Sequence, residues 1–563
     1  MVKKGVVMPT IEISLEDLNK LVGKKFSEQS LEKALEHVKG EIEAFEGDRI
    51  KIEMADTNRP DLWSTEGIAR ELRTKYTKSK GLVQFPLKKS GLKIIVDKNL
   101  KNIRPKTVCA VVKGLKITDE VLFQIIQLQE KICENFGRGR REVALGLYDY
   151  HSISPPVHFR AYKPDAIKFT PLDLDKEMDL NEILLRHPKG KQYGHLLKGM
   201  TMYPVFVDSK GNVLSMPPII NSDYSGKVTK ETKDVFIECS GFDMKFLIPS
   251  LNIMVAALAE RGGSIESVDV IFPKERTRTP DLRPKKIMVD VNNIRKLSGL
   301  NLDIKDIKNL LLKAGYEVRI KGNNLNVYYP AYRQDIMQEV DVIEDIIICY
   351  GYNKIEPLTP QISGIGRLTK INEFAKKIAE MMIGTGSQEI MSYILTNSDN
   401  LIEKMGTTTM KTIEVENPVS KNWSVFRTWL IPSLMEFLSA NTNREYPQNI
   451  FEIGEVVLFD ERAETCSRNP TKLAWAYAGN DANFTKAKQN LDFLMRNLGL
   501  KYEIEEVEHT SFIPGRVGKI SVAGKNLAYM GEVHPQVLDN FGIEQPVCAF
   551  EINLSDVATI MKK

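Results

Sequence analysis

The chain has 563 residues, of which 42% are hydrophobic and 27% are charged, and this composition excludes a disordered or fibrous protein. At roughly 150 residues per domain, the length predicts about four domains. Lysine and arginine together number 78 against 74 for aspartate and glutamate, so the net charge of +4 does not by itself indicate a nucleic-acid partner, and any basic surface must be local.

The cysteines and the apolar segments narrow the cellular setting. None of the six cysteines belongs to a C-x-x-C pair, which excludes an ordinary zinc ribbon and a disulfide scaffold and favours a reducing compartment. Pro9 and Glu12 interrupt the short apolar stretch at the start, so it lacks the core of a secretory signal. Because no uncharged apolar run approaches the roughly 18 residues of a membrane span, we expect a cytoplasmic protein with no membrane partner.

The N-terminal segment predicts one small domain over residues 1–85. Ser14, with Asp17 three residues later, is typical of a helix start, and apolar residues at helical or alternating spacing follow. The expected elements are a helix from Ser14 to Gly23, a helix from Ser27 to Gly40, strands over 42–44 and 50–54, and a helix after Pro60.

The middle of the chain predicts a mixed α/β domain over 106–272. Residues 81–105 are expected to be a connection, although Leu92 to Val96 has a short strand pattern. Strands and helices then alternate. The expected strands are 108–112, 202–207 and 235–238, and the expected helices are 120–136 and 250–261. A basic, proline-containing stretch over 272–286 follows, as a solvated linker or, alternatively, as a phosphate-contacting strip.

Two further domains are expected. Residues 285–356 predict a small unit with a strand, two helices, a second strand and a last helix. Residues 365–563 predict long helices over 373–384 and 430–441, followed by extended segments joined by glycine turns, which favour an antiparallel sheet. The expected strands of this block are 450–459, 473–478, 518–522, 527–533 and 547–552.

Motifs for several common chemistries are absent from the sequence. It has no phosphate-binding G-x-x-x-x-G-K-[ST] loop, no G-x-G-x-x-G after a strand, no H-E-x-x-H zinc motif and no G-x-S-x-G nucleophile elbow. The seven histidines show no metal-ligand spacing beyond the weak pair His151 and His158. Nothing local therefore supports nucleophilic or zinc-dependent catalysis.

One acidic constellation stands out. Asp341, Glu344 and Asp345 are spaced to share one face of a helix, with Asp335 just before that helix. Four carboxylates that converge cannot all stay ionised unless a cation or a basic partner neutralises them, and oxygen ligands of this kind suit Mg²⁺. A solvated acidic face is the alternative, because apolar residues already give this helix a buried side.

Motifs in a consistent order along nearly the whole chain resemble the beta subunit of phenylalanyl-tRNA synthetase. P-A-Y-R-Q-D-I, E-V-D-V-I-E-D-I and C-Y-G-Y-N-K-I resemble its B5 domain, and D-T-N-R-P-D-L-W-S-T-E-G-I-A-R-E-L over 56–72 resembles its N-terminal domain. I-P-G-R-V-G-K-I over 513–520 with G-E-V-H-P-Q-V-L-D-N-F-G-I over 531–543 resembles its catalytic-like module. S-M-P-P-I-I-N over 215–221 and R-G-R-R-E-V-A-L-G-L-Y-D over 138–149 resemble the archaeal and eukaryotic form of its editing domain.

The resemblance implies a multidomain α+β fold class. The implied domains are a B1-like domain at 1–85, a B3/B4-like α/β editing and tRNA-binding domain at 106–272, a small winged-helix-like B5 domain at 285–356, and a degenerate class II synthetase module at 365–563, an antiparallel sheet without catalytic residues.

The resemblance also implies a function. The chain would be the beta subunit of an α2β2 phenylalanine-tRNA ligase, which with its alpha subunit attaches phenylalanine to tRNA(Phe), using ATP at the alpha-subunit site. A phenylalanine pocket rejects an added hydroxyl by only about 10²-fold, so this chain is expected to hydrolyse mischarged Tyr-tRNA(Phe) through Ser215, Asn221 and Glu238. A freestanding tRNA-binding and trans-editing protein is the alternative. A transcription-type binder built on the 285–356 unit would leave most of the chain unexplained.

Metal and RNA contacts follow from the resemblance as well. Arg138, Arg140 and Arg141, set among glycines, are candidates to meet the 3′ end of tRNA, with a solvated loop as the alternative. In the family, Mg²⁺ ligands shared with the alpha subunit stand at the positions of the acidic constellation, where Asp345 replaces a commoner glutamate. The implied ligands are Asp335, Asp341, Glu344 and Asp345.

Overall fold

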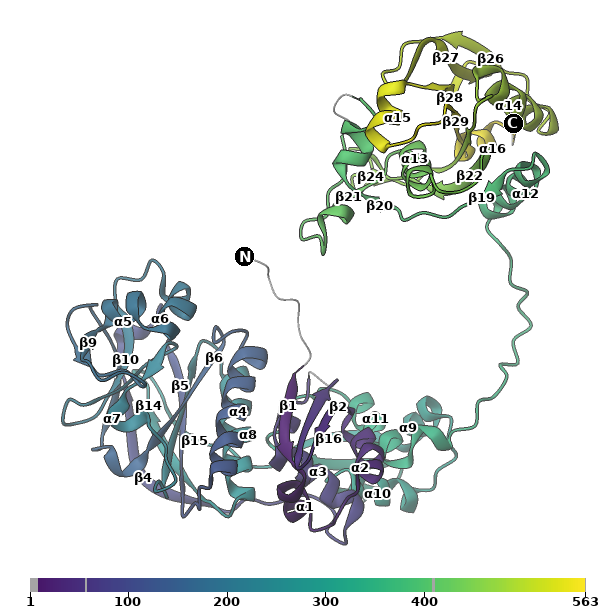
Figure 1. The fold of residues 1–563 in the computed structure, drawn as a ribbon. Coiled ribbons are helices and arrows are strands. Elements are labelled where there is room, and N and C mark those ends of the chain that lie inside the picture. Colours follow the sequence, from purple (N-terminus) through teal and green to yellow (C-terminus); the bar gives the residue numbers. More distant parts are fainter. Residues whose placement is uncertain (1–8, 56–57, 408–410, 562–563) are drawn as a thin grey trace. The chain divides into compact units, whose positions relative to one another are not determined.

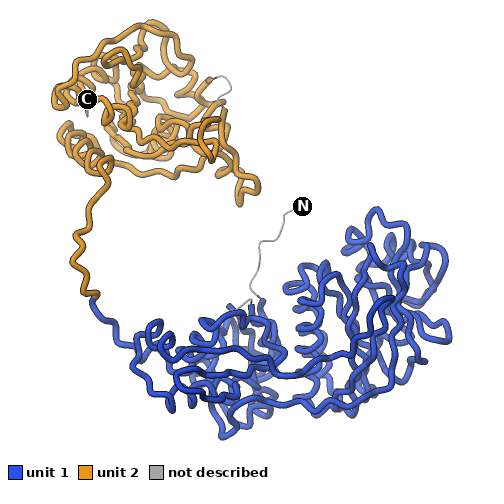
Figure 2. The backbone as a smooth tube through the Cα atoms, turned by 180° about the vertical axis from the view of Figure 1, so that it is seen from behind, with its two compact units in different colours: residues 1–359 blue, residues 360–563 orange. Residues whose placement is uncertain are grey.

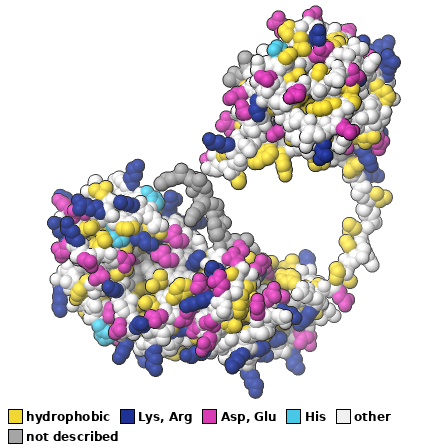
Figure 3. Space-filling model, viewed as in Figure 1, with side chains coloured by type: hydrophobic (Ala, Val, Ile, Leu, Met, Phe, Trp, Pro, Cys, Tyr) yellow, Lys and Arg dark blue, Asp and Glu magenta, His cyan; other side chains and the backbone are white. Residues whose placement is uncertain are grey.

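The chain forms two compact units, residues 1–359 and 360–563 (Figure 2). The computed structural model describes residues 9–55, 58–407 and 411–561. Within these ranges no helix is both long and apolar enough to cross a membrane. On the face seen in Figure 3, acidic and basic side chains are interspersed, as the small net charge predicts.

The N-terminal part of unit 1 is a small sheet covered by helices. The order of its antiparallel strands is β1-β3-β2. Ser14 caps the first helix, because its Oγ accepts the Asp17 N–H at 3.1 Å, and Gly23 ends it with φ +79°. The elements are β1 (Thr10–Ser14), α1 (Leu15–Val22), α2 (Glu28–Leu35), η1 (Glu36–Val38), β2 (Gly40–Glu46), β3 (Arg49–Met54) and α3 (Thr65–Tyr76).

The predicted end of the second helix is wrong in detail. The α-helix stops at Leu35, a 3₁₀ turn continues to Val38, and Lys39 at φ 51° closes it. Gly40 instead begins β2. Within the described residues, no side-chain hydrogen bond caps this turn. The apolar spacing alone therefore predicts a helix that is longer than the one observed.

A ten-stranded mixed sheet forms the middle of unit 1. Its order is β12-β11-β10-β7-β4-β14-β5-β13-β6, and β15 pairs with β14. Only the β14–β4 and β4–β7 pairs are parallel. The strands are β4 (Leu87–Val96), β5 (Lys106–Lys113), β6 (Val143–Asp149), β7 (Val157–Tyr162), β10 (Tyr203–Val207), β11 (Val213–Met216), β12 (Ile220–Asn221), β13 (Val235–Gly241), β14 (Ser264–Ile271) and β15 (Arg276–Thr279).

Two segments expected to connect domains belong to this sheet. Residues 81–105 contain β4, whose buried Leu92, Ile94 and Val96 lie between β14 and β7. The pattern over 92–96 predicted only the buried second half of β4, because residues 87–91 are mostly exposed. In the basic stretch after residue 272, β15 pairs with β14.

The basic stretch is partly neutralised within the chain. Arg276 and Arg278 lie 2.6 and 2.9 Å from the two carboxylate oxygens of Asp269, and Arg283 lies 2.5 Å from Asp281. Three of its six basic side chains therefore have acidic partners, and their net field toward a phosphate is weakened.

Two long helices lie along one side of the sheet (Figure 1). They are α4 (Asp119–Lys131), continued by the π-helical turn η4 (Ile132–Phe136), and α8 (Met244–Glu260). Helix α8 begins six residues before the predicted start at residue 250, and it contains Pro249. Pro249 has no N–H to donate to the Lys245 carbonyl. Lys245 is exposed, so water can hydrogen-bond that carbonyl instead.

The last part of unit 1 is a small helical unit with an antiparallel sheet of order β16-β18-β17. Strand β17 was not predicted, because its outer half is polar and exposed. Its elements are β16 (Lys285–Asp290), α9 (Val291–Ser298), α10 (Ile304–Lys313), β17 (Glu317–Lys321), β18 (Asn324–Tyr329) and α11 (Glu339–Tyr350).

Short elements complete unit 1. They are η2 (Pro60–Leu62), η3 (Lys98–Leu100), η5 (Tyr150–Ser152), β8 (Lys168–Phe169), β9 (Met178–Asp179), α5 (Leu180–Arg186), α6 (Pro188–Tyr193), η6 (Gly194–Leu197), α7 (Asp223–Gly226) and η7 (Tyr352–Lys354).

Unit 2 is built on a seven-stranded sheet of order β19-β22-β25-β29-β28-β27-β26. Every pair is antiparallel except β19 with β22, which confirms the expected antiparallel sheet. Trp475 stacks on Phe550 in its core, at 5.3 Å between ring centroids. Its strands are β19 (Gln388–Glu389), β22 (Gln448–Glu455), β25 (Thr471–Ala478), β26 (Glu503–Glu506), β27 (Phe512–Val522), β28 (Lys525–Val533) and β29 (Val547–Asn553).

Both expected helices of unit 2 are present, and α14 was missed. The longer helices are α12 (Lys370–Gly384), α13 (Ile431–Ala440) and α14 (Phe484–Asn497). The remaining elements are β20 (Leu395–Thr396), η8 (Asp399–Glu403), η9 (Lys421–Trp423), β21 (Val425–Phe426), β23 (Leu458–Phe459), β24 (Ser467–Arg468), α15 (Pro535–Phe541) and α16 (Leu554–Ile560).

Buried ion pairs tie the N-terminal helices to α8. The Arg261 guanidinium lies 2.6 Å from Asp17 and 2.6 Å from Glu66, and all three side chains are at most 15% exposed. Arg73 pairs in the same way with Glu260, at 2.8 Å. The N-terminal residues also share one hydrophobic core with α4 and α8. The division of this unit into separate domains at residue 85 stays a prediction.

We expect Arg261→Ala to lower the free energy of unfolding by roughly 3–5 kcal/mol, because it leaves two buried carboxylates without a cation. Urea unfolding of the full chain, followed by circular dichroism, measures this loss. Arg186→Ala is the matched control, since its pair with Glu182 is exposed and should contribute less than about 1 kcal/mol. Equal losses for the two variants would contradict a structural role for the buried pairs.

Candidate functional site

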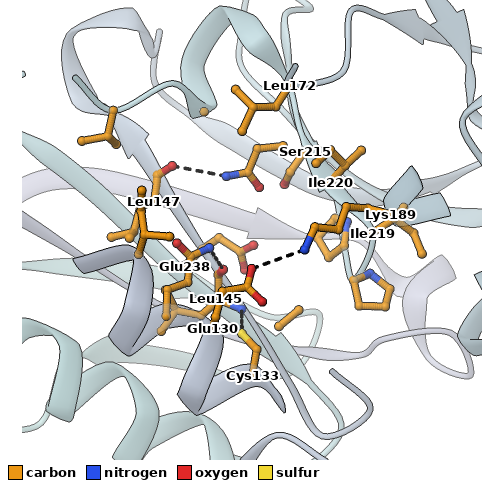
Figure 4. A pocket seen from close by; sticks show the side chains of 18 of the residues that line it. Glu130, Cys133, Leu145, Leu147, Leu172, Lys189, Ser215, Ile219, Ile220 and Glu238 are labelled. Carbon is orange, nitrogen blue, oxygen red and sulfur yellow. Dashed lines mark hydrogen bonds and ion pairs between the residues drawn. The ribbon is translucent and has the colours of Figure 1, made fainter. Parts of the chain in front are cut away.

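A cavity of about 360 Å³ opens beside the outer strands β6 and β13 (Figure 4). Its walls come from α4, β6, the turn between β11 and β12, and α7. Most lining side chains are apolar, and polar or charged side chains make up the rest of the wall. The apolar lining includes Leu122, Ile125, Leu145, Leu147, Leu172, Ile219 and Ile220. Such a cavity suits a small organic group held by a few polar contacts.

The three predicted editing residues meet at this cavity. Ser215 lies in β11, Asn221 in β12 and Glu238 in β13, and all three line the cavity wall. The bend expected at the two prolines is present, because the Ile219 N–H donates to the Met216 carbonyl. The structure thus brings together residues that are up to 23 positions apart in sequence, as Ser215 and Glu238 show.

Tyr148 connects these residues and was not predicted. Its hydroxyl lies 2.7 Å from Ser215 Oγ, 3.2 Å from Glu238 Oε1 and 3.4 Å from Asn221 Oδ1. Its ring is fully buried. Because one phenol donates only one proton, the hydroxyl orients a network and does not serve all three as donor.

Gly146 makes this arrangement possible. It stands opposite Glu238 in the antiparallel pairing of β6 with β13. A Cβ atom at this position would lie 2.2 Å from the Tyr148 hydroxyl oxygen. A side chain here would therefore force the tyrosine ring off the network. The glycine and the tyrosine both lie in the quoted stretch over 138–149, so alternation along one strand was the signal that could have found Tyr148.

The Glu238 carboxyl is buried and incompletely bonded. The residue is 2% exposed, and its Oε2 has no hydrogen-bond partner among the described residues. Burial raises the pKa of Glu238 to about 8, against the opposing influence of Arg104 and Tyr148. At neutral pH the group is therefore mainly a neutral acid, which offers both an O–H donor and an acceptor to the cavity.

The three candidate arginines have different surroundings. Arg140 is turned inward, where it lies 2.9 Å from Glu130 and donates to the carbonyls of Pro218 and Ile219. Arg138 and Arg141 are exposed. Only the last two therefore have guanidinium groups available to a ligand outside the fold.

The mouth of the cavity carries an opposite-charge pair. Figure 4 shows Glu130 and Lys189 facing each other, at 3.7 Å. Tyr193 stacks under Arg140 at 4.2 Å and so joins α6 to the same rim. These contacts hold α4 and α6 around the opening.

The four acidic residues near α11 are each matched within the chain. Arg333 lies 2.6 Å from Asp335 and 2.8 Å from Asp345. Asp341 accepts two backbone N–H groups at the start of α11, both at 2.7 Å, and Glu344 pairs with Lys39 at 3.0 Å. Among residues 9–55, 58–407 and 411–561, no three acidic, histidine or cysteine side chains are grouped so as to hold a metal ion.

This donor set does not fit a metal ion held by this chain alone. Burial would raise the pKa of Asp335, but Arg333 holds it below its usual value. Asp335 and Asp345 are therefore neutralised by a basic side chain, which is one of the two possibilities that the sequence raised for the acidic constellation. The Mg²⁺ assignment stays a prediction. Asp56 and Thr57, the first residues of the quoted N-terminal motif, lie outside the described residues.

Known protein families match most of the chain. Residues 120–251 match the B3/4 domain, residues 287–352 match the tRNA synthetase B5 domain, and residues 355–554 match the phenylalanyl tRNA synthetase beta chain CLM domain.

Whole-chain relatives and a solved structure agree with these matches. The phenylalanine–tRNA ligase beta subunits of Pyrococcus abyssi and Pyrococcus horikoshii are each 49% identical over 551 residues, covering 97% of this chain and 99% of the relative. The same-named protein of Archaeoglobus fulgidus is 39% identical over 97% of this chain and 98% of its own length. The crystal structure of an N-terminal fragment of the Pyrococcus horikoshii phenylalanyl-tRNA synthetase beta subunit matches with a TM-score of 0.60 and 47% identity, covering 61% of this chain and all of the fragment.

We expect the stability of unit 1 to fall as pH rises from about 4.5 to 8, by up to roughly 1.4 kcal/mol per pH unit. The folded protein holds a proton on Glu238 through this range, whereas the unfolded chain releases it. Urea midpoints of the wild type and of Glu238→Gln, measured across this range, isolate the effect. Parallel pH profiles for the two proteins would rule out a buried neutral acid.

We expect EDTA to leave the thermal unfolding midpoint of the purified chain unchanged, because Arg333 already neutralises Asp335 and Asp345. Arg333→Ala should cost roughly 3–5 kcal/mol, since it strands two carboxylates that are at most 14% exposed. Scanning calorimetry with and without added Mg²⁺ checks both points. A midpoint that rises with Mg²⁺ in the wild type would show that the ion binds the folded chain.

Proposed function

Because the chain belongs to the family of phenylalanine–tRNA ligase beta subunits, we propose that its 360 Å³ cavity is an editing site that hydrolyses Tyr-tRNA(Phe). The chain is thus a subunit of an aminoacyl-tRNA ligase, a class of enzyme that serves protein synthesis, and in this family the synthetic site lies with the alpha subunit. Coverage of 97–99% in both directions does not favour a freestanding trans-editing protein.

The observation that carries the proposal is the unpartnered Oε2 of Glu238, beside the apolar side chains that make up most of the cavity lining. A tyrosyl side chain fills such a space and brings a phenol hydroxyl that can bond this carboxyl. Phenylalanine would leave the buried carboxyl unsatisfied. A site built around such a bond rejects the analogue that lacks the hydroxyl by roughly 10⁴–10⁵-fold. Correctly charged Phe-tRNA would therefore escape hydrolysis.

The lining residues support attack by water and not by a protein nucleophile. Burial raises the pKa of the Cys133 thiol to about 12, and its sulfur already accepts the Leu145 N–H. Ser215 Oγ is bonded to Tyr148, and no histidine lines the cavity. Neither group is therefore an activated nucleophile.

In the proposed reaction, a water oxygen adds to the ester carbonyl carbon and the bond from that carbon to the ribose oxygen breaks. The proton lost by water passes to the leaving ribose oxygen, and free tyrosine and uncharged tRNA result. Ser215 and Asn221 hold the aminoacyl group, and the neighbouring ribose hydroxyl assists the transfer. Glu238 recognises the phenol and is not the base, because it is mainly protonated.

The holoenzyme is part of the proposal. An alpha subunit, in an α2β2 assembly, would bind ATP with Mg²⁺ and attach phenylalanine to tRNA(Phe), in the cytoplasm. Unit 2 would serve that partner as a degenerate class II module, and its antiparallel sheet supports this assignment. The domain division at 1–85, 106–272, 285–356 and 365–563 is proposed in the same sense. The proposed hydrolysis uses no metal at Asp335, whose carboxylate is already paired with Arg333.

We expect Glu238→Ala, assayed in the enzyme co-expressed with its alpha subunit, to slow Tyr-tRNA(Phe) hydrolysis at least 10²-fold while leaving phenylalanine charging unchanged. Asn221→Ala should also slow hydrolysis. Single-turnover release of tyrosine measures both effects, and Asp165→Ala, an exposed acid of the same unit that does not line the cavity, is the control. Unchanged hydrolysis in both variants would refute the residue assignment. The purified chain without its partner should not charge tRNA.

A further inference from the structure

A second cavity, of about 190 Å³, lies next to the first. The two share Pro218 as a wall, since Pro217 and Pro218 line the first and Pro218 also lines the second. The polar and aromatic side chains of the second cavity are Arg104, Arg141, His195 and Phe242. Three of these four side chains are basic, and none of the described residues that line the cavity is acidic.

Arg104 is a buried cation without an acidic partner. The residue is 3% exposed, and its guanidinium donates to the Ser240 side chain and to the backbone carbonyls of Ser240, Arg140 and Arg141. Within the described residues it makes no ion pair. Burial lowers its pKa to about 10, so the group stays charged at neutral pH. No acidic side chain of the described chain lines the cavity to offset its positive charge there, which favours an anion.

The outer side chains of this cavity are free to meet a ligand. Arg141 is exposed, and in the described part of the chain its guanidinium has no ion pair, while its carbonyl is held by Arg104. His195, on η6, presents an exposed ring whose Nδ1 lies 3.1 Å from the Gln192 carbonyl oxygen, so Nε2 is the nitrogen left for a ligand. Phe242, just past the end of β13, is 44% exposed. An exposed aromatic face between basic side chains is typical of sites for single-stranded nucleic acid.

One face of β13 connects the two cavities. Side chains two residues apart on a strand point the same way, so Glu238 and Ser240 share one face of β13, and Phe242 follows just past the end of the strand. Glu238 lines the first cavity, Ser240 anchors Arg104, and Phe242 lines the second. A ligand that extends from the first cavity therefore meets the basic and aromatic groups next.

We propose that the second cavity binds the penultimate nucleotide of the RNA whose terminal, aminoacylated nucleotide occupies the first cavity. Phe242 stacks on the base, and Arg141 with His195 contacts the phosphate that joins the two nucleotides. The inference rests on the proposed function and deepens it, because it assigns which nucleotide of the RNA end lies in which cavity. Arg140 takes no part, since its guanidinium is bonded inside the fold.

Binding tests this assignment independently of hydrolysis. Fluorescence anisotropy with uncharged CpCpA and the purified full chain should show about 5- to 100-fold weaker binding for Phe242→Ala, and near-wild-type binding for Phe242→Trp. Arg141→Ala should weaken binding and reduce the salt dependence by about one phosphate contact. Phe123→Ala is the matched control, because Phe123 is 38% exposed in the same unit and lines neither cavity. CpCpA binding unaffected by Phe242→Ala would overturn the proposal.

Hydrolysis tests this placement of the nucleotides. With the holoenzyme, the tyrosyl ester of CpA should be cleaved at least 10-fold faster than tyrosyl-adenosine, and Phe242→Ala should remove that preference. If the wild type cleaves neither ester nor Tyr-tRNA(Phe), the proposed editing function fails, while the CpCpA measurement still decides the nucleotide site. If cleavage occurs and the preference survives in Phe242→Ala, the nucleotide site fails and the editing function stands. Binding of AMP as tight as that of CpCpA would also overturn it, because one nucleotide would then suffice.

Discussion

The site depends on one constraint, which is that the Glu238 carboxyl is kept out of water without an ion pair. Burying a charged carboxylate costs far more than burying a neutral acid, so the group holds its proton and its pKa rises. The fold enforces this state through the pairing of β13 with both β5 and β6, which places Glu238 inside the sheet and opposite Gly146. The space above that glycine admits Tyr148, and its hydroxyl then fixes one oxygen of the acid and leaves the other free for a ligand.

The same strand explains why a recognition site and a basic cavity are neighbours. Ser240 follows Glu238 on one face of β13 and binds Arg104, so the cation lies close enough to oppose the rise in the Glu238 pKa without forming an ion pair with it. If that carboxyl were ionised, Arg104 would face a negative charge and its field at the second cavity would be weakened. The neutral acid thus serves two purposes: it offers a donor to a phenol, and it leaves the cation free to attract a phosphate.

Local signals in the sequence predicted what depends on local physics. Ser14 and Gly23 bound α1 because capping and a positive φ act within a few residues. The strands of unit 2 could be predicted as extended segments between glycine turns, and the central strands β25 and β29 are buried on both faces. Only the second half of β4 was predicted, because its first half is polar. Its place in the large sheet was missed because its pairing partners, β14 and β7, come much later in the chain. Ser215 and Asn221 were found in the S-M-P-P-I-I-N motif. Tyr148 also lies in a quoted motif, but its role depends on Ser215 and Glu238, which only the fold brings to its hydroxyl. Arg104 carried no sequence signal at all, since its function depends on which carbonyls the fold brings to it.

The pKa values of Asp335 and Glu238 are shifted in opposite directions, because the fold places different groups against the two carboxyls. Asp335 and Asp345 face the buried Arg333, which keeps Asp335 ionised and supplies the charge that a metal would otherwise provide. Glu238 faces a phenol and an empty, apolar space, so it stays neutral. Spacing on a helix can show that carboxylates share a face, but it cannot show which cation lies opposite. The acidic cluster of α11 is therefore a joint between elements of unit 1, and the solitary Glu238, which no spacing rule singled out, is the group whose chemistry remains available to a substrate.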